Sequence, residues 1–286
     1  MATSGYLRGV SELLAAAAAR LDDVLDTVAD QCATTLQEGG LIHLFGSGHS
    51  ALPALDAFPR YGSYVGLHPL TDPRLLWHTV TGPGGVPELL WLERAEHYIE
   101  NYLAHQPLNA GDVLLVYSHS GRNAAAIETA QYAAERGLVT VAVTSLANAD
   151  LPATHSSGRR LAEICDYVLD TGVPRADAIV AIPGWHAPLG AASTVVTCAI
   201  THELLTRTAA RLSDSGVTLP TFVAPTARLD AAAPGQGPDT DRDPATIFRA
   251  YRQRLLAAQA RALQTPLEPP AQIPLEPPAQ APPCER

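Results

Sequence analysis

Residues 113–123 read Val-Leu-Leu-Val-Tyr-Ser-His-Ser-Gly-Arg-Asn, an apolar strand that runs into a small polar loop. Residues 41–50, Leu-Ile-His-Leu-Phe-Gly-Ser-Gly-His-Ser, repeat this arrangement. A loop of Gly and Ser between a strand and a helix exposes backbone N–H groups where the helix dipole favours an anion. If the two strands are neighbours in a parallel sheet, both loops open onto one crevice. The two stretches together therefore predict an anion-binding site.

Neither loop matches the fingerprints of nucleotide-binding proteins. Residues 46–48 lack the further glycine of a dinucleotide loop, and the chain has no Gly-Lys-Ser or Gly-Lys-Thr of a P-loop. A small phosphate monoester is therefore favoured over a nucleotide. Gly and Ser also serve plain turns and helix caps, so a structural role for either loop alone stays open.

Composition excludes several classes of function. The chain has 286 residues and 47% hydrophobic content, enough for one large soluble domain with extensions. All 19 basic residues are arginine, which excludes a lysine Schiff base and a P-loop lysine. The net charge of −10 and the lack of an arginine stripe argue against a nucleic-acid partner.

Cysteine usage and hydropathy predict the cellular compartment. The four cysteines are far apart and form no C-x-x-C pair, so neither a disulfide framework nor a zinc knuckle is expected. No apolar run reaches the roughly 18 residues of a membrane span, and the first residues do not resemble a secretory leader. We therefore expect a cytoplasmic protein with no membrane partner.

Hydrophobic periodicity predicts a parallel α/β sandwich. Residues 4–37 read as a helix, because apolar side chains recur every three or four positions. Short apolar strands then alternate with helices. The expected strands are 41–45, 64–67, 113–117, 139–143, 167–169 and 178–182, and the expected helices are 51–58, 87–105, 124–136 and 190–212.

The same pattern divides the chain into segments. We expect an N-terminal helical segment, a main domain, a linker with a C-terminal helix and an extended proline-rich tail. Their bounds are 1–40, 41–228, 229–263 and 264–286.

The loop motifs resemble the sugar isomerase (SIS) domain. The resemblance rests on the first loop, on Ser-x-Ser-Gly-Arg-Asn at 118–123, on Thr-Ser at 144–145 and on residues 157–174. It spans roughly residues 4–225 and is nearest to bacterial SIS domain-containing or phosphosugar-binding proteins. It implies a three-layer, flavodoxin-like α/β sandwich with a five-stranded parallel sheet, additional N-terminal helices and a homodimeric or tetrameric assembly. It also implies a sugar phosphate bound at the strand C-termini.

The substrate-binding residues come from the resemblance and from the loops themselves. By position, the resemblance implies that the ligand is lined by Ser47, Ser50, Ser118, Ser120, Asn123, Thr144 and Ser145. His49 and His119 join this set because each lies inside a ligand loop and could donate to substrate hydroxyls. No H-x-H or H-x-x-x-H spacing occurs, so we assign no metal and no cofactor.

Isomerisation of an aldose to a ketose needs a base that moves a proton between C1 and C2 through an enediol. Asp56 lies six residues after Ser50, near the mouth of the site. Glu93 and Glu96 lie in a stretch that resembles a Glu-Arg-x-Glu-Gly pattern, with His97 in place of the glycine. These carboxylates could equally be solvated or paired with arginine.

His202 is the remaining candidate base, and three functions are considered for the site. His202 lies, with Glu203, in a helix that carries a catalytic histidine in some isomerases of the family. We expect a phosphosugar isomerase first and a non-catalytic sugar-phosphate sensor second. A sugar-phosphate etherase is disfavoured, because the acid expected near the end of the first helix of the domain falls at Phe58–Pro59.

Overall fold

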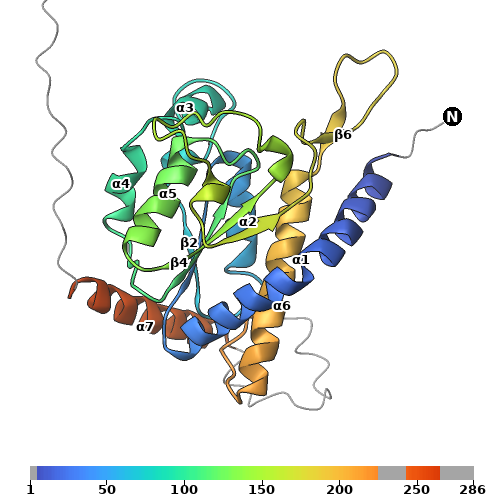
Figure 1. Cartoon of the computed structure of the whole chain (residues 1–286). Coiled ribbons are helices and arrows are strands. Elements are labelled where there is room, and N and C mark those ends of the chain that lie inside the picture. The colour runs from blue at the N-terminus through green and yellow to red at the C-terminus, as the bar shows by residue number, and fades with distance from the viewer. Residues whose placement is uncertain (1–4, 225–242, 265–286) are drawn as a thin grey trace, which may run out of the picture.

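The computed structural model describes residues 5–224 and 243–264 and has three layers (Figure 1). A five-stranded parallel sheet of strand order β2-β1-β3-β4-β5 lies between helices, which confirms the predicted fold class. Its strands are β1 (Ile42–Gly46), β2 (Leu67–Leu70), β3 (Val113–Tyr117), β4 (Val139–Thr144) and β5 (Tyr167–Asp170).

The order of the strands places the two polar loops side by side. β1 pairs with β3 in register, from Ile42 opposite Val113 to Gly46 opposite Tyr117. From β1 the chain first adds β2 on one side and then crosses to add β3 on the other. A crevice opens beyond the carboxyl ends of the strands at such a point of reversal. The fold therefore supports the expectation that both loops share one crevice.

Helices cover both faces of the sheet, which is why β1 and β3 are buried along their whole length. One apolar core packs α1, α2 and α6 on the sheet, and the other packs α3, α4 and α5. These helices are α1 (Tyr6–Gln37), α2 (Leu52–Ala57), α3 (Val86–Leu92), α4 (Tyr98–Leu103), α5 (Ala124–Glu135) and α6 (Ser193–Asp214). The four short 3₁₀ turns are η1 (Gly48–Ala51), η2 (Pro73–Leu75), η3 (Leu146–Asn148) and η4 (Leu161–Glu163).

The last described helix, α7 (Pro244–Ala262), packs against the loops that lead into β1 and β3. Its Arg254 donates to the carbonyls of Leu36 and Gly40, and its Ala258 carbonyl accepts from the Asn109 side chain. The expected linker and proline-rich tail lie almost wholly outside the described residues. Among the helices described, none combines the length and the apolar character needed to cross a membrane.

Several expected elements differ in the structure. The strand expected at 64–67 starts at Leu67. The strand expected at 178–182 is β6 (Ala178–Val180), which lies outside the main sheet and pairs antiparallel with β7 (Leu189–Ala191) in a ribbon that projects from the body (Figure 1). Because the ribbon includes residues 189–191, the helix expected from 190 begins only at Ser193, as α6. There the Asp177 carboxylate accepts a hydrogen bond from the Ser193 N–H.

The helix expected at 87–105 is broken into α3 and α4. The break falls at His97, whose φ of 65° is left-handed and cannot continue a helix. This conformation suits glycine, which is the residue that the related sequence pattern places there. The departure from that pattern therefore introduces local backbone strain.

Replacing His97 by glycine is expected to stabilise the protein by up to about 1 kcal/mol, because glycine adopts this φ without steric cost. The lost side chain contributes little, since its 3.5 Å ion pair with Glu100 is largely exposed. Chemical denaturation of the two proteins measures the difference. A His97→Ala variant should gain nothing, since alanine keeps the steric conflict.

Candidate functional site

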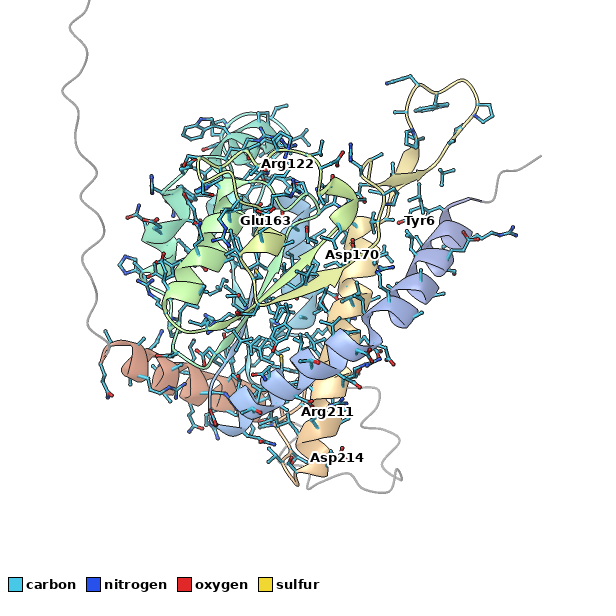
Figure 2. The ribbon with its side chains drawn as sticks, viewed as in Figure 1. Tyr6, Arg122, Glu163, Asp170, Arg211 and Asp214 are labelled. Atoms are coloured by element: carbon cyan, nitrogen blue, oxygen red, sulfur yellow. The ribbon has the colours of Figure 1, made fainter. Side chains whose placement is uncertain are left out.

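The two polar loops meet at the carboxyl end of the sheet. The first follows β1 and enters the 3₁₀ turn η1, while the second follows β3 and enters α5. In Figure 2, Arg122 of the second loop lies at the upper end of the sheet, and Arg211 marks the lower part of α6. Gly121 has a φ of 61°, a turn conformation of the kind in which successive N–H groups can face one anion.

Glu93 connects the two loops. Its carboxylate accepts from the Ser47 hydroxyl at 2.8 Å and from the Asn123 amide at 2.7 Å. Its backbone carbonyl accepts from the Ala125 N–H at 3.0 Å. The residue is only 9% exposed, and this burial raises the pKa of the carboxyl group, while the Ser47 bond acts in the opposite direction. The structure thus places one buried carboxylate between the predicted ligand loops.

A small crevice lies between the two loops and α6, and Glu93 is not among the residues that line it. It brings together four residues predicted from the sequence, which are His49, Ser50, Ser118 and His119. Four hydroxyl residues that the sequence did not single out as ligands also line it, namely Thr171, Ser193, Thr194 and Thr197, together with Pro53, Tyr117 and Val143. The run of small hydroxyl residues at the start of α6 is the sequence pattern from which the lining residues of this helix could have been predicted. The His119 Nδ1 atom is buried without a hydrogen-bond partner among the described residues.

The other predicted loop residues have roles within the loops. The Ser118 hydroxyl accepts from the Gly121 N–H at 3.1 Å. Half-buried Ser120 offers its carbonyl to the Arg160 guanidinium. Thr144 and Ser145 are buried beneath the second loop, where the Ser145 hydroxyl donates to the Val173 carbonyl at 2.5 Å. Thr144 and Ser145 thus contact the protein itself in this structure.

Asp56 and His202 form a separate pair on α2 and α6. The His202 Nε2 and the Asp56 carboxylate lie 2.9 Å apart, and Arg60 also contacts Asp56. Burial alone would raise the pKa of Asp56, but its bonds to His202 and Arg60 outweigh this and lower it. Both side chains of the pair are more than a third exposed. A lowered pKa makes Asp56 a weaker base than Glu93.

Glu96 also lies apart from Glu93. Its carboxylate accepts from the N–H and the hydroxyl of Ser156, at 2.7 and 2.5 Å. The four candidate bases therefore occupy three different clusters, of which only that of Glu93 joins both ligand loops.

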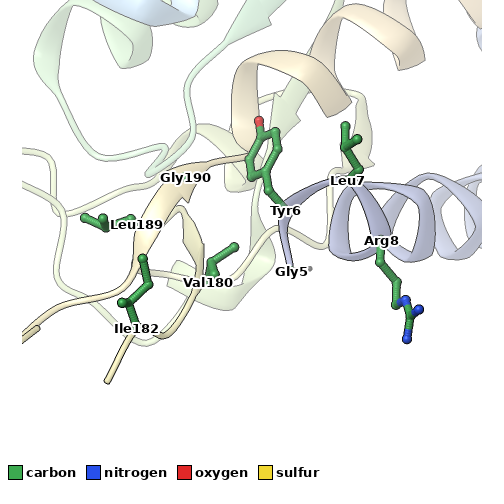
Figure 3. A pocket seen from close by; sticks show the side chains of 8 residues that line it. All are labelled: Gly5, Tyr6, Leu7, Arg8, Val180, Ile182, Leu189 and Gly190. Carbon is green, nitrogen blue, oxygen red and sulfur yellow. The ribbon is translucent and has the colours of Figure 1, made fainter. Parts of the chain in front are cut away.

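A wider hollow lies elsewhere, between the first turn of α1 and the β6–β7 ribbon (Figure 3). It is lined mainly by apolar groups, including Leu7, Val180 and Leu189. Tyr6 uses its hydroxyl to donate to the Ala191 carbonyl at 2.7 Å. Phosphate recognition needs convergent polar groups, so this hollow does not suit a sugar phosphate.

Comparison with known proteins places the chain in a family. The family model for the SIS domain matches residues 5–145. A UPF0309 protein of Geobacillus kaustophilus is 32% identical over 220 residues, which are 77% of this chain and 86% of that protein. The chain belongs to the UPF0309 family of SIS-domain proteins. Another UPF0309 protein, from Streptomyces coelicolor, is 37% identical over 201 residues, or 69% of this chain and 78% of that protein.

Solved structures similar to this UPF0309 protein include enzymes and a regulator. A phosphoheptose isomerase from Neisseria gonorrhoeae has 19% identity and a TM-score of 0.49, covering 71% of this chain and 94% of that one. The sugar isomerase domain of an RpiR transcription factor from Sphaerobacter thermophilus has 16% identity and a TM-score of 0.37, covering 74% and 96%.

Proposed function

We propose that this protein is a phosphosugar isomerase that interconverts an aldose and a ketose through an enediol, with Glu93 as the base. The observation that carries this proposal is the buried Glu93 carboxylate, bonded to Ser47 of one loop and Asn123 of the other. Through Asn123, the carboxylate contacts the loop that we propose holds the phosphate. SIS-domain membership supports a phosphosugar as the ligand.

The second loop holds the phosphate in this proposal. Ser118 and Ser120 supply hydroxyl groups, and the turn at Gly121 followed by the N-terminus of α5 supplies backbone N–H groups. His49 and His119 flank the crevice and donate to the sugar hydroxyls. The phosphate fixes one end of the sugar, and the carboxylate acts on the other.

The electrostatic state of Glu93 suits proton transfer. Burial raises its pKa, so the carboxylate is a stronger base than one exposed to water. It must be ionised to accept a proton from carbon. We therefore expect kcat/KM to fall as the pH is lowered through this raised pKa and to be constant above it, up to the pKa of any catalytic acid.

Proton NMR in D2O tests the proposal directly. The protein is incubated with a panel of hexose, heptose and amino-sugar phosphates. Interconversion of one sugar, with deuterium uptake at the carbon next to its carbonyl, is the expected result. No exchange across the panel, together with a raised melting temperature for one sugar, would identify a sugar-phosphate sensor and contradict the isomerase.

Replacing Ser120 by phenylalanine is expected to weaken sugar-phosphate binding on the order of 10- to 100-fold, because the ring fills the space of the phosphate. The matched control is Ser213→Phe, at an exposed position near the far end of α6. Isothermal titration with the sugar phosphate found in the panel measures both variants. If Ser120→Phe bound the sugar phosphate with unchanged affinity, the second loop would not be the phosphate-binding site.

A further inference from the structure

Three side chains that are distant in the sequence converge on the α3–α4 side of the sheet. Glu96 lies in the turn between α3 and α4, Glu128 lies within α5, and His155 lies in the segment between η3 and η4. One ligand-type atom from each lies within 4.8 Å of the others. The cluster is outside the polar crevice described above.

The two separations from His155 within this cluster are longer than those of ordinary N–H···O hydrogen bonds. The His155 Nε2 atom lies 3.4 Å from a Glu128 oxygen and 3.8 Å from a Glu96 oxygen. Ligand atoms bound tetrahedrally at about 2.1 Å from one ion are separated by roughly 3.4 Å. The observed separations are thus close to the distances between neighbouring ligand atoms in a metal site.

Glu128 provides an independent observation. The residue is 4% exposed, and its Oε2 atom is buried without a hydrogen-bond partner in the described part of the chain. Its Oε1 atom accepts from the His97 N–H at 2.7 Å. Within the same described residues, no arginine forms an ion pair with Glu96 or Glu128. A buried carboxylate oxygen normally has a partner. This one belongs to the same carboxylate whose Oε1 atom faces His155 Nε2, so it is available to a cation bound at the cluster.

The surrounding groups orient the cluster as outer-shell partners do around a metal. Ser156 donates twice to Glu96. The Ser157 hydroxyl lies 2.7 Å from the His155 Nδ1 atom. The Ser157 N–H also lies 3.2 Å from Nδ1 and donates to it, which leaves the ring proton of neutral His155 on Nε2. Binding of an ion at Nε2 therefore requires the proton to move to Nδ1, where the Ser157 hydroxyl can accept it, and the Ser157 N–H to turn away from the ring. The titratable groups that face the cluster are His97 and Glu100, in addition to its three members.

We propose that Glu96, Glu128 and His155 bind a divalent transition-metal cation, with a nitrogen and oxygen ligand set that suits Zn²⁺. The ion joins the turn that follows Glu93 to α5 and to the segment that carries His155. The neighbouring Thr154 donates to the Asn123 side chain at 3.2 Å. The metal therefore stabilises the segments that border the second loop, but it does not lie in the proposed sugar-phosphate site.

Titration calorimetry of the chelator-treated full-length protein with Zn²⁺ tests this site. We expect saturable binding of one ion and a rise in the melting temperature of about 5–10 °C at 100-fold excess over Kd. His155→Ala and Glu128→Gln should each weaken binding by at least about tenfold. Glu135→Gln is the matched control, because this exposed carboxylate lies at the last residue of α5, on the same helix as Glu128 but outside the cluster. It should bind Zn²⁺ as the wild type does.

Co²⁺ provides a second readout that does not depend on stability or activity. Its visible absorption band should appear on addition to the wild type and be lost in Glu96→Gln, whose half-buried position makes normal folding easier to keep than at the buried Glu128. The absence of one-to-one Zn²⁺ binding, or equal affinity in His155→Ala, Glu128→Gln and the wild type, would overturn the proposal. Neither result depends on isomerase activity.

Discussion

The Glu93→Gln variant is expected to bind its sugar phosphate normally and to lose about 10²- to 10⁴-fold in kcat, the usual contribution of a positioned general base. Glutamine has the shape of glutamate, and its amide oxygen can still accept from Asn123. Its NH2 group can donate to Ser47, whose hydroxyl is able to accept. The fold of the two loops is therefore preserved while the proton acceptor is removed.

Steady-state kinetics and calorimetry on the same preparation separate these two effects. Asp56→Asn is the informative comparison, because Asp56 and His202 form the other candidate acid–base pair. Glu203→Gln, an exposed change on α6, serves as the control. Full turnover in Glu93→Gln, with loss in Asp56→Asn, would transfer the role of base to the Asp56–His202 pair.

Replacing Asp112 by alanine is expected to destabilise the protein by about 3–5 kcal/mol, because the change removes a buried charge that organises the opposite end of the sheet. Asp112 is 1% exposed. Its carboxylate accepts from the Leu41 N–H at 2.9 Å, from His43 Nε2 at 3.0 Å and from the Asn109 N–H at 3.2 Å. Alanine leaves these donors buried and unpaired.

Urea denaturation of wild type and Asp112→Ala measures this loss. Asp30→Ala is the matched control, because Asp30 pairs with Arg211 at the surface and should contribute about 1 kcal/mol or less. A loss below about 1 kcal/mol in Asp112→Ala would show that water or a rearranged backbone replaces the carboxylate.

The sheet could be predicted from the sequence because its strands are continuous apolar runs between turn residues. β3 and β4 are expected within one residue of their observed bounds. The β6–β7 ribbon was missed because β7 has only three residues and includes a glycine, too little for any pattern. The break between α3 and α4 was missed because apolar spacing continues across it, although the glycine expected at position 97 was a sign of a turn.

The sequence pointed to the two loops of the candidate site, but it left the choice of base open among Asp56, Glu93, Glu96 and His202. Glu93 and Glu96 are three residues apart, which predicts a shared helix face. α3 ends at Leu92, so the turn that follows sends Glu93 to Ser47 and Asn123 but Glu96 to Ser156. The proposed metal ligands come from three separate segments, and no local spacing in the sequence relates them.

The backbone bond from the Ala125 N–H to the Glu93 carbonyl ties the end of α3 to the start of α5. With the bond from the Asn123 amide to the Glu93 carboxylate, it holds this carboxylate at a fixed place relative to the second loop. We therefore expect the site to be selective for sugars of one carbon-chain length. Sugars of the right length would present their carbonyl end to Glu93, and shorter or longer ones would be bound but left unchanged.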